Sequence, residues 1–378
     1  MIVAFDVSHM LRRRAGLGRF SVVMLRSLLS ADRERTYVLH GWSRDLDEEA
    51  IRSFVQPNVR LSIARIPGAV KRMYWNYLRF PELQKIIGPF DVFHGAEPLL
   101  PPVGNNNSIV TVHDLAYKKF PHFFDEWTAR KWDFLYRRSI QKADAVIVPS
   151  VNTRNDLLEM ISLPPEKVHV IRPPVNPAFS GACPADVAAD IRMKYSIADQ
   201  YILFVGTIEP RKNIPGLIRA FEILQGKTSH PLSLVIVGGT GWSFSDIMTT
   251  ITTSKAAKNI ILPGYVDDTS LAALYRSALM FVFPSFYEGH GFPVVEAMAS
   301  GIPVITSNNS SLKEIGDGAS ILVDPDNSEQ ISEAMERLYL DEALRAELAL
   351  KGRQRAAQFS VKNAVDGILR LYTSFEKN

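Results

Sequence analysis

Short apolar runs alternate regularly with longer amphipathic stretches along this sequence, and this pattern limits the folds that it can adopt. The runs are rich in β-branched and aromatic residues, which favour strands, and the stretches between them have helical periodicity. Such alternation is typical of parallel sheets covered by helices on both faces. It occurs twice, so we predict an α/β chain with two doubly wound, Rossmann-like domains.

The predicted strands and helices fill both halves of the chain. The strands are predicted at 2–7, 36–41, 60–65, 92–95, 108–113, 145–149, 201–206, 232–238, 260–262, 280–283, 304–306 and 321–323. The clearest helices are predicted at 18–30, 125–142, 150–161, 213–225, 269–276, 294–299, 328–340 and 361–376.

A proline-rich segment separates the two halves. Residues 172–185 read RPPVNPAFSGACPA, a composition typical of a domain boundary. We therefore predict an N-terminal domain at 1–175, a C-terminal domain at 176–360, and a final helix at 361–378.

Cysteine content and hydropathy exclude several classes of protein. Cys183 is the only cysteine of 378 residues, which excludes a disulfide framework and a cysteine-rich zinc site. No apolar run is long enough to cross a membrane, and the first ten residues read as a buried strand rather than a signal peptide. We expect a cytoplasmic protein.

The net charge of +3 conceals an asymmetry: residues 1–180 carry +7 and residues 181–378 carry −4. The basic residues of the first half cluster with aromatics, as in KRMYWNYLRF at 71–80 and RKWDFLYRR at 130–138. Such clusters suit the headgroup region of an anionic membrane. A solvated helix face explains them equally well. Nucleic acid, which can bind by stacking and phosphate contact, is the least favoured partner.

Two candidate motifs lie in the first half. Gly16 and Gly18 form a G-x-G where the first strand should turn into a helix, so backbone amides there can approach a phosphate. A purely structural turn fits equally well. His113 and Asp114 end a predicted strand, and ligands of open α/β sheets bind beyond strand ends. His113 can donate to a sugar hydroxyl, whereas Asp114 can equally be a cap.

The second half carries a basic pair at the corresponding place. Arg211 and Lys212, within GTIEPRKN at 206–213, lie in a predicted strand-to-helix loop. Arg can contact a diphosphate through two nitrogens, and Lys acts as a point charge. A solvated pair is the simpler alternative, but the position at a strand end favours phosphate binding.

The most specific motif is EGHGFPVVE at 288–296, with two glutamates eight positions apart around a glycine-rich turn. Pro293 suits the start of a helix, so we expect Glu288 in the loop and Glu296 in the first helical turn. Carboxylates accept hydrogen bonds from hydroxyls, while loop amides and a helix N-terminus favour phosphate. The pattern indicates a ligand with both groups.

Two Asp-x-Asp pairs, at 45–47 and 324–326, resemble metal ligands but read as an acidic surface and a helix cap. No cluster of His, Asp and Glu demands a metal, and we expect no metal cofactor.

Taken together, GTIEPRKN, the Glu-x7-Glu segment and AMASGIPVI at 297–305 resemble glycosyltransferase family 4. The resemblance covers nearly the whole chain and is densest from 201 to 323. It implies the GT-B fold, in which two Rossmann-like domains face across a cleft and the last helix crosses back to the first domain. It also implies retaining, metal-independent transfer from a nucleotide sugar.

The resemblance implies roles for individual residues. Arg211 and Lys212 would bind the diphosphate, Glu288 the hydroxyls of the donor sugar, and Glu296 the ribose. His113 would lie near O6 of the sugar. The remaining donor-binding positions would be Gly16 and Gly18 near the distal phosphate, Tyr265 and Val266 at the base, and Gly291, Phe292, Pro293 and Val294 at the diphosphate.

Within the family, GTIEPRKN and FYEGHGFP look most similar to mannosyltransferases of bacterial O-antigen and surface polysaccharides, which use GDP-mannose. The family usually has a small or aromatic residue where His290 stands, so the sugar stays open. The implied acceptor is a polyprenyl diphosphate-linked saccharide, with peripheral contact at the inner membrane. The alternatives are a UDP- or dTDP-sugar donor, and a sugar-nucleotide binding subunit without catalysis. A dehydrogenase is disfavoured because no complete glycine fingerprint is present.

Overall fold

The computed structural model divides into two compact units. The first unit is Met1–Pro174 with Val361–Asn378, and the second is Val175–Ser360. The structure describes all residues except 9, 11–16, 44–47, 67–69, 71–72, 182–184, 229–230, 243 and 377–378. The candidate Gly16, the 45–47 pair and Cys183 therefore lie outside the described residues.

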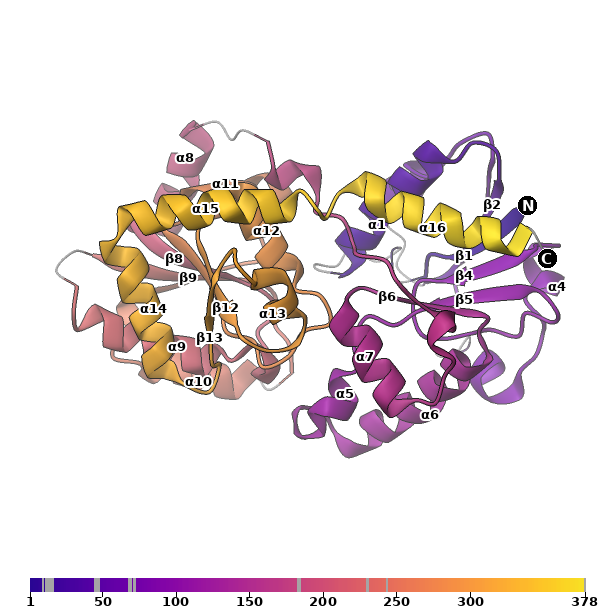
Figure 1. Ribbon diagram of the computed structural model, residues 1–378, viewed down its shortest axis with the longest axis horizontal. Coiled ribbons are helices and arrows are strands. Elements are labelled where there is room, and N and C mark those ends of the chain that lie inside the picture. The colour runs from indigo at the N-terminus through magenta and orange to yellow at the C-terminus, as the bar shows by residue number, and fades with distance from the viewer. Residues whose placement is uncertain are drawn as a thin grey trace. The chain divides into compact units, whose positions relative to one another are not determined.

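The first unit is built on a parallel sheet in the order β3-β2-β1-β4-β5-β6-β7 (Figure 1). Its strands are β1 Ile2–Asp6, β2 Thr36–Trp42, β3 Val59–Ala64, β4 Val92–Gly95, β5 Asn107–Thr111, β6 Ala145–Val148 and β7 Val168–Val170. Its helices are α1 Leu17–Ala31, α2 Glu48–Arg52, η1 Met73–Leu78, α4 Gln84–Ile87, α5 Ala116–Lys119, η2 Pro121–Phe123, α6 Glu126–Lys142, α7 Val151–Met160, η3 Pro165–Lys167 and α16 Val361–Glu376.

Alternation along β1 divides the first unit's core into two layers. Val3 and Phe5 face one layer with α1 and α16, whereas Ala4 faces the other layer with Ile140 of α6 and Leu157 of α7. Helix α16 is fixed to this unit by polar contacts as well. Tyr372 lies 2.6 Å from Nδ1 of buried His94.

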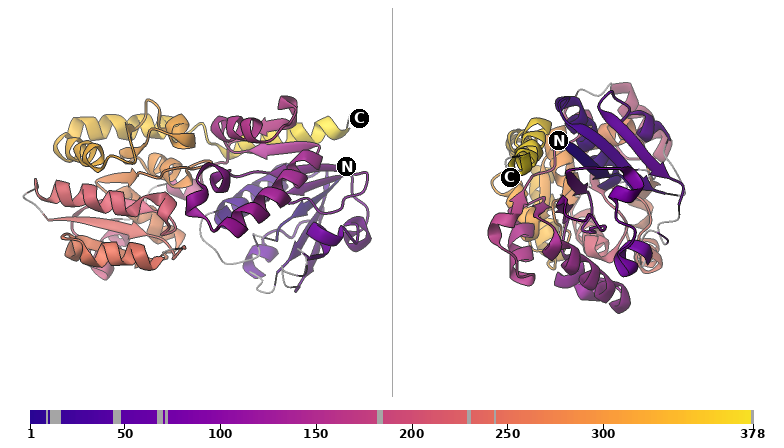
Figure 2. Two further views of the ribbon diagram at one scale, coloured as in Figure 1. Left: turned by 90° about the horizontal axis from the view of Figure 1, so that it is seen from below. Right: turned by 90° about the vertical axis from the view of Figure 1, so that its right-hand side faces the viewer.

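The second unit has a parallel sheet in the order β10-β9-β8-β11-β12-β13, with helices on both faces (Figure 2). Its strands are β8 Gln200–Val205, β9 Leu232–Val237, β10 Ile260–Gly264, β11 Met280–Phe283, β12 Val304–Ser307 and β13 Ile321–Val323. Its helices are η4 Pro177–Phe179, α8 Ala185–Tyr195, η5 Pro210–Lys212, α9 Ile214–Gln225, α10 Phe244–Thr253, η6 Ala257–Asn259, α11 Asp268–Ser277, α12 Phe292–Ser300, α13 Ser310–Gly316, α14 Ser328–Leu340 and α15 Glu342–Ala356.

The prediction of two doubly wound, Rossmann-like parallel sheets is confirmed. In the second unit the strand order reverses between β8 and β11, which are hydrogen-bonded neighbours, Met280 opposite Ile202. Loops that leave two such strands diverge to opposite faces and open a crevice at the carboxyl edge. The GTIEPRKN loop follows β8 and the EGHG loop follows β11, so the topology brings both motifs to this point.

Candidate active site

The loop after β8 positions the basic pair. Its last turn, η5, is followed by Asn213, whose left-handed backbone (φ 53°) lets the side chain accept a hydrogen bond from the Gly216 amide. This caps α9 and satisfies one of the amides that a helix start leaves unpaired. Arg211 and Lys212 are thereby held immediately before the helix.

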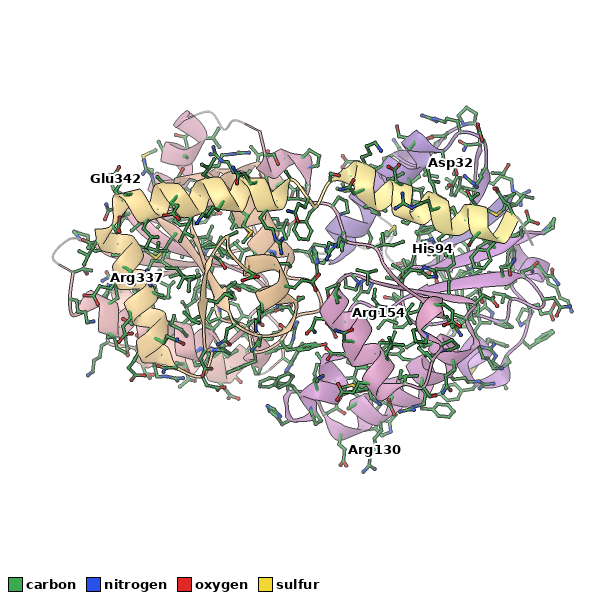
Figure 3. The ribbon with its side chains drawn as sticks, viewed as in Figure 1. Asp32, His94, Arg130, Arg154, Arg337 and Glu342 are labelled. Atoms are coloured by element: carbon green, nitrogen blue, oxygen red, sulfur yellow. The ribbon has the colours of Figure 1, made fainter. Side chains whose placement is uncertain are left out.

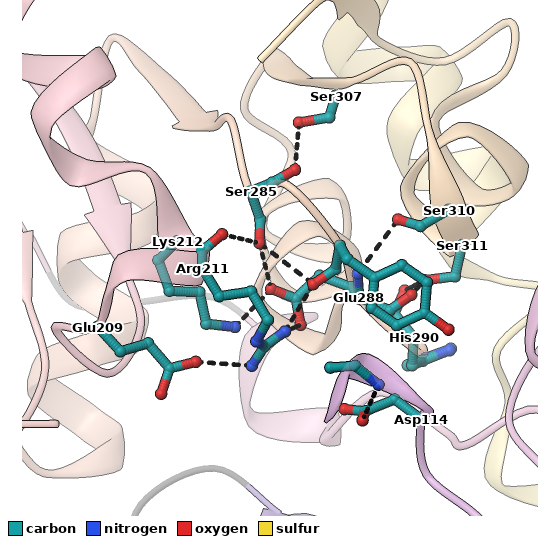
Figure 4. A network of polar contacts seen from close by, with 12 residues as sticks. Asp114, Glu209, Arg211, Lys212, Ser285, Glu288, His290, Ser307, Ser310 and Ser311 are labelled. Atoms are coloured by element: carbon teal, nitrogen blue, oxygen red, sulfur yellow. Dashed lines mark hydrogen bonds and ion pairs between the residues drawn. The ribbon is translucent and has the colours of Figure 1, made fainter. Parts of the chain in front are cut away.

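The cations of this loop form ion pairs with a carboxylate of the EGHG loop (Figure 4). Arg211 Nη1 lies 2.8 Å from Oε2 of Glu288, and Lys212 Nζ lies 2.5 Å from Oε1. Arg211 Nη2 also contacts Oε1 of Glu209 at 2.7 Å. Glu288 is 7% exposed and the other three are mostly buried. Two acids and two bases thus share a site with little water.

Burial and neighbouring charge set the protonation of this cluster. Burial alone would raise the pKa of Glu288, but Arg211, Lys212 and a hydrogen bond from Ser285 bring it to about 2. Burial and the like charge of Arg211 lower the pKa of Lys212, which Glu288 partly offsets. Glu288 is therefore an ionised acceptor of hydrogen bonds near neutral pH, not a proton donor.

Serines hold the EGHG loop in place. The Ser311 hydroxyl lies within bonding distance of the carbonyls of Glu288 and His290, at 2.9 and 2.8 Å. The Glu288 amide donates to Ser310 Oγ at 3.2 Å, and Ser285 Oγ donates to Oε1 of Glu288 at 2.7 Å. Sequence reasoning missed Ser310 and Ser311, because no pattern links them to a loop about twenty positions earlier. Ser285, three positions before Glu288, was missed as well.

Gly291 is the N-cap of α12, the helix after this loop. Its φ of 98° and the 2.7 Å that would separate an added Cβ from Leu312 Cδ2 both require glycine. Pro293 lies in the first turn of α12, as expected, and Phe292 begins it. The Val294 amide already donates to the Gly291 carbonyl at 3.0 Å, so this amide serves the helix rather than an open anion position.

Glu296 lies in the second turn of α12, not in the first as the sequence suggested, because the helix begins at Phe292 before the proline. Its Oε2 accepts a hydrogen bond from Tyr275 of α11 at 3.0 Å. Tyr275 is fully buried, so this bond fixes the carboxylate. The motif pointed to Glu296, but sequence reasoning missed its partner Tyr275, which lies on another helix 21 positions earlier.

The loop after β10 contains the positions expected to meet the base. Gly264 has a left-handed φ of 73°, Tyr265 is 60% exposed and Val266 is buried. The neighbouring β8 and β9 ends approach closely, since a Cβ on Gly238 would lie 1.9 Å from the Gly206 carbonyl oxygen. At the carboxyl ends of β8, β9 and β10, backbone groups are therefore available to contact a base.

His113 and Asp114 belong to the first unit, beyond the end of β5. Nε2 of His113 donates to the Ala96 carbonyl at 2.8 Å, and burial lowers its pKa. The ring is thus neutral with Nδ1 as an acceptor, whereas the sequence suggested a donor. Asp114 caps a turn through the Ala116 amide at 3.0 Å.

A cavity of about 70 Å³ adjoins His113 within the first unit. Its lining is mainly apolar and includes Phe5 of β1, Met24 of α1 and Ile368 of α16. Gly18 lies in the first turn of α1. The first unit therefore lines a mainly apolar pocket with two neutral histidines, His94 and His113, whereas the second unit brings four charged side chains together.

The Asp324–Asp326 pair belongs to a loop before a capped helix, and the 45–47 pair lies outside the described residues. Asp324 accepts from the Asp326 amide at 3.0 Å, and Asn327 caps α14. Among the described residues, no three His, Cys, Asp or Glu side chains are grouped to hold a metal ion. Also within those residues, no helix is long and apolar enough to cross a membrane.

Comparisons with known proteins agree with this architecture. Residues 14–179 match the family described as Glycosyltransferase Family 4, and residues 190–355 match Glycosyl transferases group 1. The chain is 29% identical to O-antigen chain mannosyltransferase B of Escherichia coli over 74% of both chains. It is 30% identical to the serotype-specific mannosyltransferase WbdA of Escherichia coli over 63% of this chain, but spans only 30% of WbdA.

Solved structures share the fold across the whole length. Sucrose-phosphate synthase from Thermosynechococcus elongatus has a TM-score of 0.81 and 21% identity, and the match covers 100% of this chain and 99% of that one. At this identity the similarity establishes the architecture alone.

Proposed function

This chain belongs to the GT-B glycosyltransferases that join a family 4 domain to a group 1 domain, and we propose that it transfers mannose from GDP-mannose with retention of configuration. It is related to O-antigen mannosyltransferases. The names of those relatives support mannose as the sugar. The observation that carries the proposal is the contact of Arg211 and Lys212 with Glu288 at the reversal point of the sheet.

In the proposed complex, the donor diphosphate takes over contacts that Glu288 makes with the two cations. Both cations are already oriented and shielded from water, so they stabilise the negative charge that grows on the leaving phosphate. The ionised Glu288 then accepts hydrogen bonds from sugar hydroxyls, and Glu296, fixed by Tyr275, accepts them from the ribose. Neither carboxylate needs to change protonation.

We propose that the acceptor hydroxyl attacks from the face that the diphosphate leaves. A carbon–oxygen bond to the acceptor forms while the bond to the phosphate oxygen breaks, and the hydroxyl proton passes to that oxygen. His113, neutral with an acceptor nitrogen, suits a hydrogen bond from a sugar hydroxyl better than donation to an oxyanion.

The proposed acceptor is a polyprenyl diphosphate-linked saccharide at a membrane surface. The exposed face of α6 supports this: Trp127 and Phe134 are 70% and 59% exposed, with Arg130 and Lys131 between them. These positions follow i, i+3, i+4, i+7 and therefore share one face. Arg130 projects from the helix into solvent (Figure 3). Aromatic and basic side chains on one face suit the interface of an anionic bilayer.

The test of the donor is a thermal-shift panel of GDP, UDP, ADP and dTDP, followed by turnover of GDP-mannose with the lipid-linked acceptor. GDP should raise the melting temperature most, since a ligand at 100 times its Kd stabilises by about 2.7 kcal/mol. A larger shift with UDP or dTDP would identify another donor. Binding without GDP release would instead indicate a binding subunit.

Metal independence is a separate part of the proposal. Because Arg211 and Lys212 supply two positive charges for the diphosphate, EDTA should leave the rate of mannose transfer unchanged. Loss of activity that magnesium restores would show that the side chains do not suffice.

A further inference from the structure

Glu209 is a member of the ionic cluster for which neither the motifs nor the proposed mechanism gives a role. Its carboxylate is nearly buried, and Oε1 lies 2.7 Å from Nη2 of Arg211 (Figure 4). Arg211 Nη1 is meanwhile held by Oε2 of Glu288 and by the Tyr287 carbonyl at 2.6 Å. Two acids therefore fix one guanidinium from two sides.

The charges of the cluster sum to zero before a donor arrives. Arg211 and Lys212 contribute two positive charges, and Glu209 and Glu288 contribute two negative charges. A nucleotide-sugar diphosphate adds two negative charges in a place with little water, where unbalanced charge is costly. Binding therefore favours the loss of negative charge from one of the carboxylates.

The surroundings of the two acids differ. Glu288 contacts both cations and Ser285, whereas Glu209 contacts Arg211 through one oxygen. The loop on the other side of Glu209, GGTG at 238–241, has no titratable side chain, although an added Cβ on Gly241 would lie 3.1 Å from Glu209 Cβ. Within the part of the chain that the structure describes, the charged groups that act on Glu209 are Arg211, Lys212 and Glu288.

The protonation tendencies of the two acids agree with this asymmetry. Burial raises the pKa of Glu209 more than Arg211 and Lys212 lower it, whereas the pKa of Glu288 is about 2. When the cations bind a diphosphate instead, they no longer stabilise the ionised form of Glu209, which stays buried. The pKa of Glu209 therefore rises further.

We propose that Glu209 is a positioning residue that holds Arg211 in place before the donor arrives, and that it takes up one proton from solvent when a nucleotide-sugar diphosphate binds. The carboxylate becomes a neutral carboxylic acid, which no longer repels the phosphates. This inference rests on the proposed function only in that a nucleotide sugar is the ligand; it does not depend on which base or sugar it carries.

Calorimetric titration with GDP-mannose tests this at pH 7, in buffers that differ in ionisation enthalpy. The phosphates of this ligand have no group that titrates near neutrality, so proton exchange reports on the protein. The wild type should take up close to one proton per ligand, and its affinity should weaken up to tenfold per pH unit above 7. Glu209→Gln should bind the ligand without proton uptake and without this loss of affinity above pH 7.

The control is Glu333→Gln, which changes an exposed acid of α14 in the same unit and should keep the wild-type proton uptake. Ligand binding without proton uptake in the wild type would overturn the proposal, as would uptake that persists in Glu209→Gln. If GDP-mannose does not bind but UDP-glucose does, with proton uptake, the proposed donor is wrong and the role of Glu209 stands.

Discussion

The two units of this protein have the same kind of sheet but different chemistry at its carboxyl edge. The second unit gathers Glu209, Arg211, Lys212 and Glu288, all in direct ionic contact. The first unit places neutral His113 beside an apolar cavity, and α6 of that unit exposes aromatic rings. The two units thus share a sheet covered by helices, and the loops after particular strands determine which kind of ligand each unit can bind.

The largest expected effect comes from removing a cation of the second unit. Lys212→Ala should lower turnover by about 10²–10³-fold, the usual loss for one well-placed group that stabilises transition-state charge. Steady-state rates of mannose transfer measure it, with circular dichroism to check the fold. Lys258→Ala, an exposed lysine of the same unit, is the matched control. Activity within a few-fold of wild type in Lys212→Ala would contradict the phosphate role.

Substitutions in the first unit should change membrane binding, whereas those in the second unit change catalysis. Replacing Arg130 and Lys131 with Gln removes two cations from the exposed face of α6, each worth about 1 kcal/mol at an anionic surface. Partitioning onto liposomes with anionic lipid should fall by about 30-fold, measured by sedimentation. The same double change at Lys255 and Lys258 of the second unit should leave it unaltered. Equal partitioning of both double variants would make the α6 face an ordinary solvated surface.

Removal of the Ser311 hydroxyl, which contacts the EGHG loop, should lower both the stability of the protein and its affinity for the donor. Ser311→Ala leaves the carbonyls of Glu288 and His290 with one donor fewer, which should cost about 1–3 kcal/mol and raise the KM for the donor. Urea unfolding and steady-state kinetics measure the two effects. Ser332→Ala is the contrast, because that buried hydroxyl has no hydrogen-bond partner among the described residues, and its loss should be nearly neutral. An unchanged KM in Ser311→Ala would show that the EGHG loop keeps its conformation without the Ser311 hydroxyl.

The smallest effect concerns acid sensitivity of the first unit. Burial lowers the pKa of His94 to about 3 from an ordinary value near 6.5. Between these values the unfolded chain binds the extra proton, so stability is full above about 6.5 and falls with acidification. His94 should cost about 1.4 kcal/mol between pH 7.5 and 5.5. In urea unfolding, His94→Gln should lose less stability over that range; an equal loss would assign it to other groups.

Much of this fold was predictable because strand signals are local. The predicted limits of β4, β11 and β13 are those observed. Strand β7 (VHV) was missed because His169 interrupts its apolar run, whereas the equally short β13 (ILV) is apolar throughout. Helix α10 was missed because its threonines lower helix propensity. Their hydroxyls instead bond to carbonyls one turn earlier, as Thr253 does with Thr249.

The site was less predictable than the sheet. The sequence placed Arg211 and Lys212 in one loop and Glu288 in another, but these loops are 76 positions apart, and their contact depends on which strands are neighbours. Tyr275 carried no signal because its partner Glu296 lies on another helix, 21 positions later. Glu209 carried none because its role depends on the charges of the assembled cluster, although its partner Arg211 is only two positions away.

The return of α16 to the first unit has a consequence for synthesis. Ala364, Ile368 and Tyr372 complete a core that otherwise comes from residues before 175, and Arg35 pairs with Glu376 at 3.0 Å. On the ribosome, the whole of 175–360 must be translated before that core can close. We therefore expect the second unit to become protease-resistant first on the nascent chain. The first unit should become resistant only after α16 has been translated.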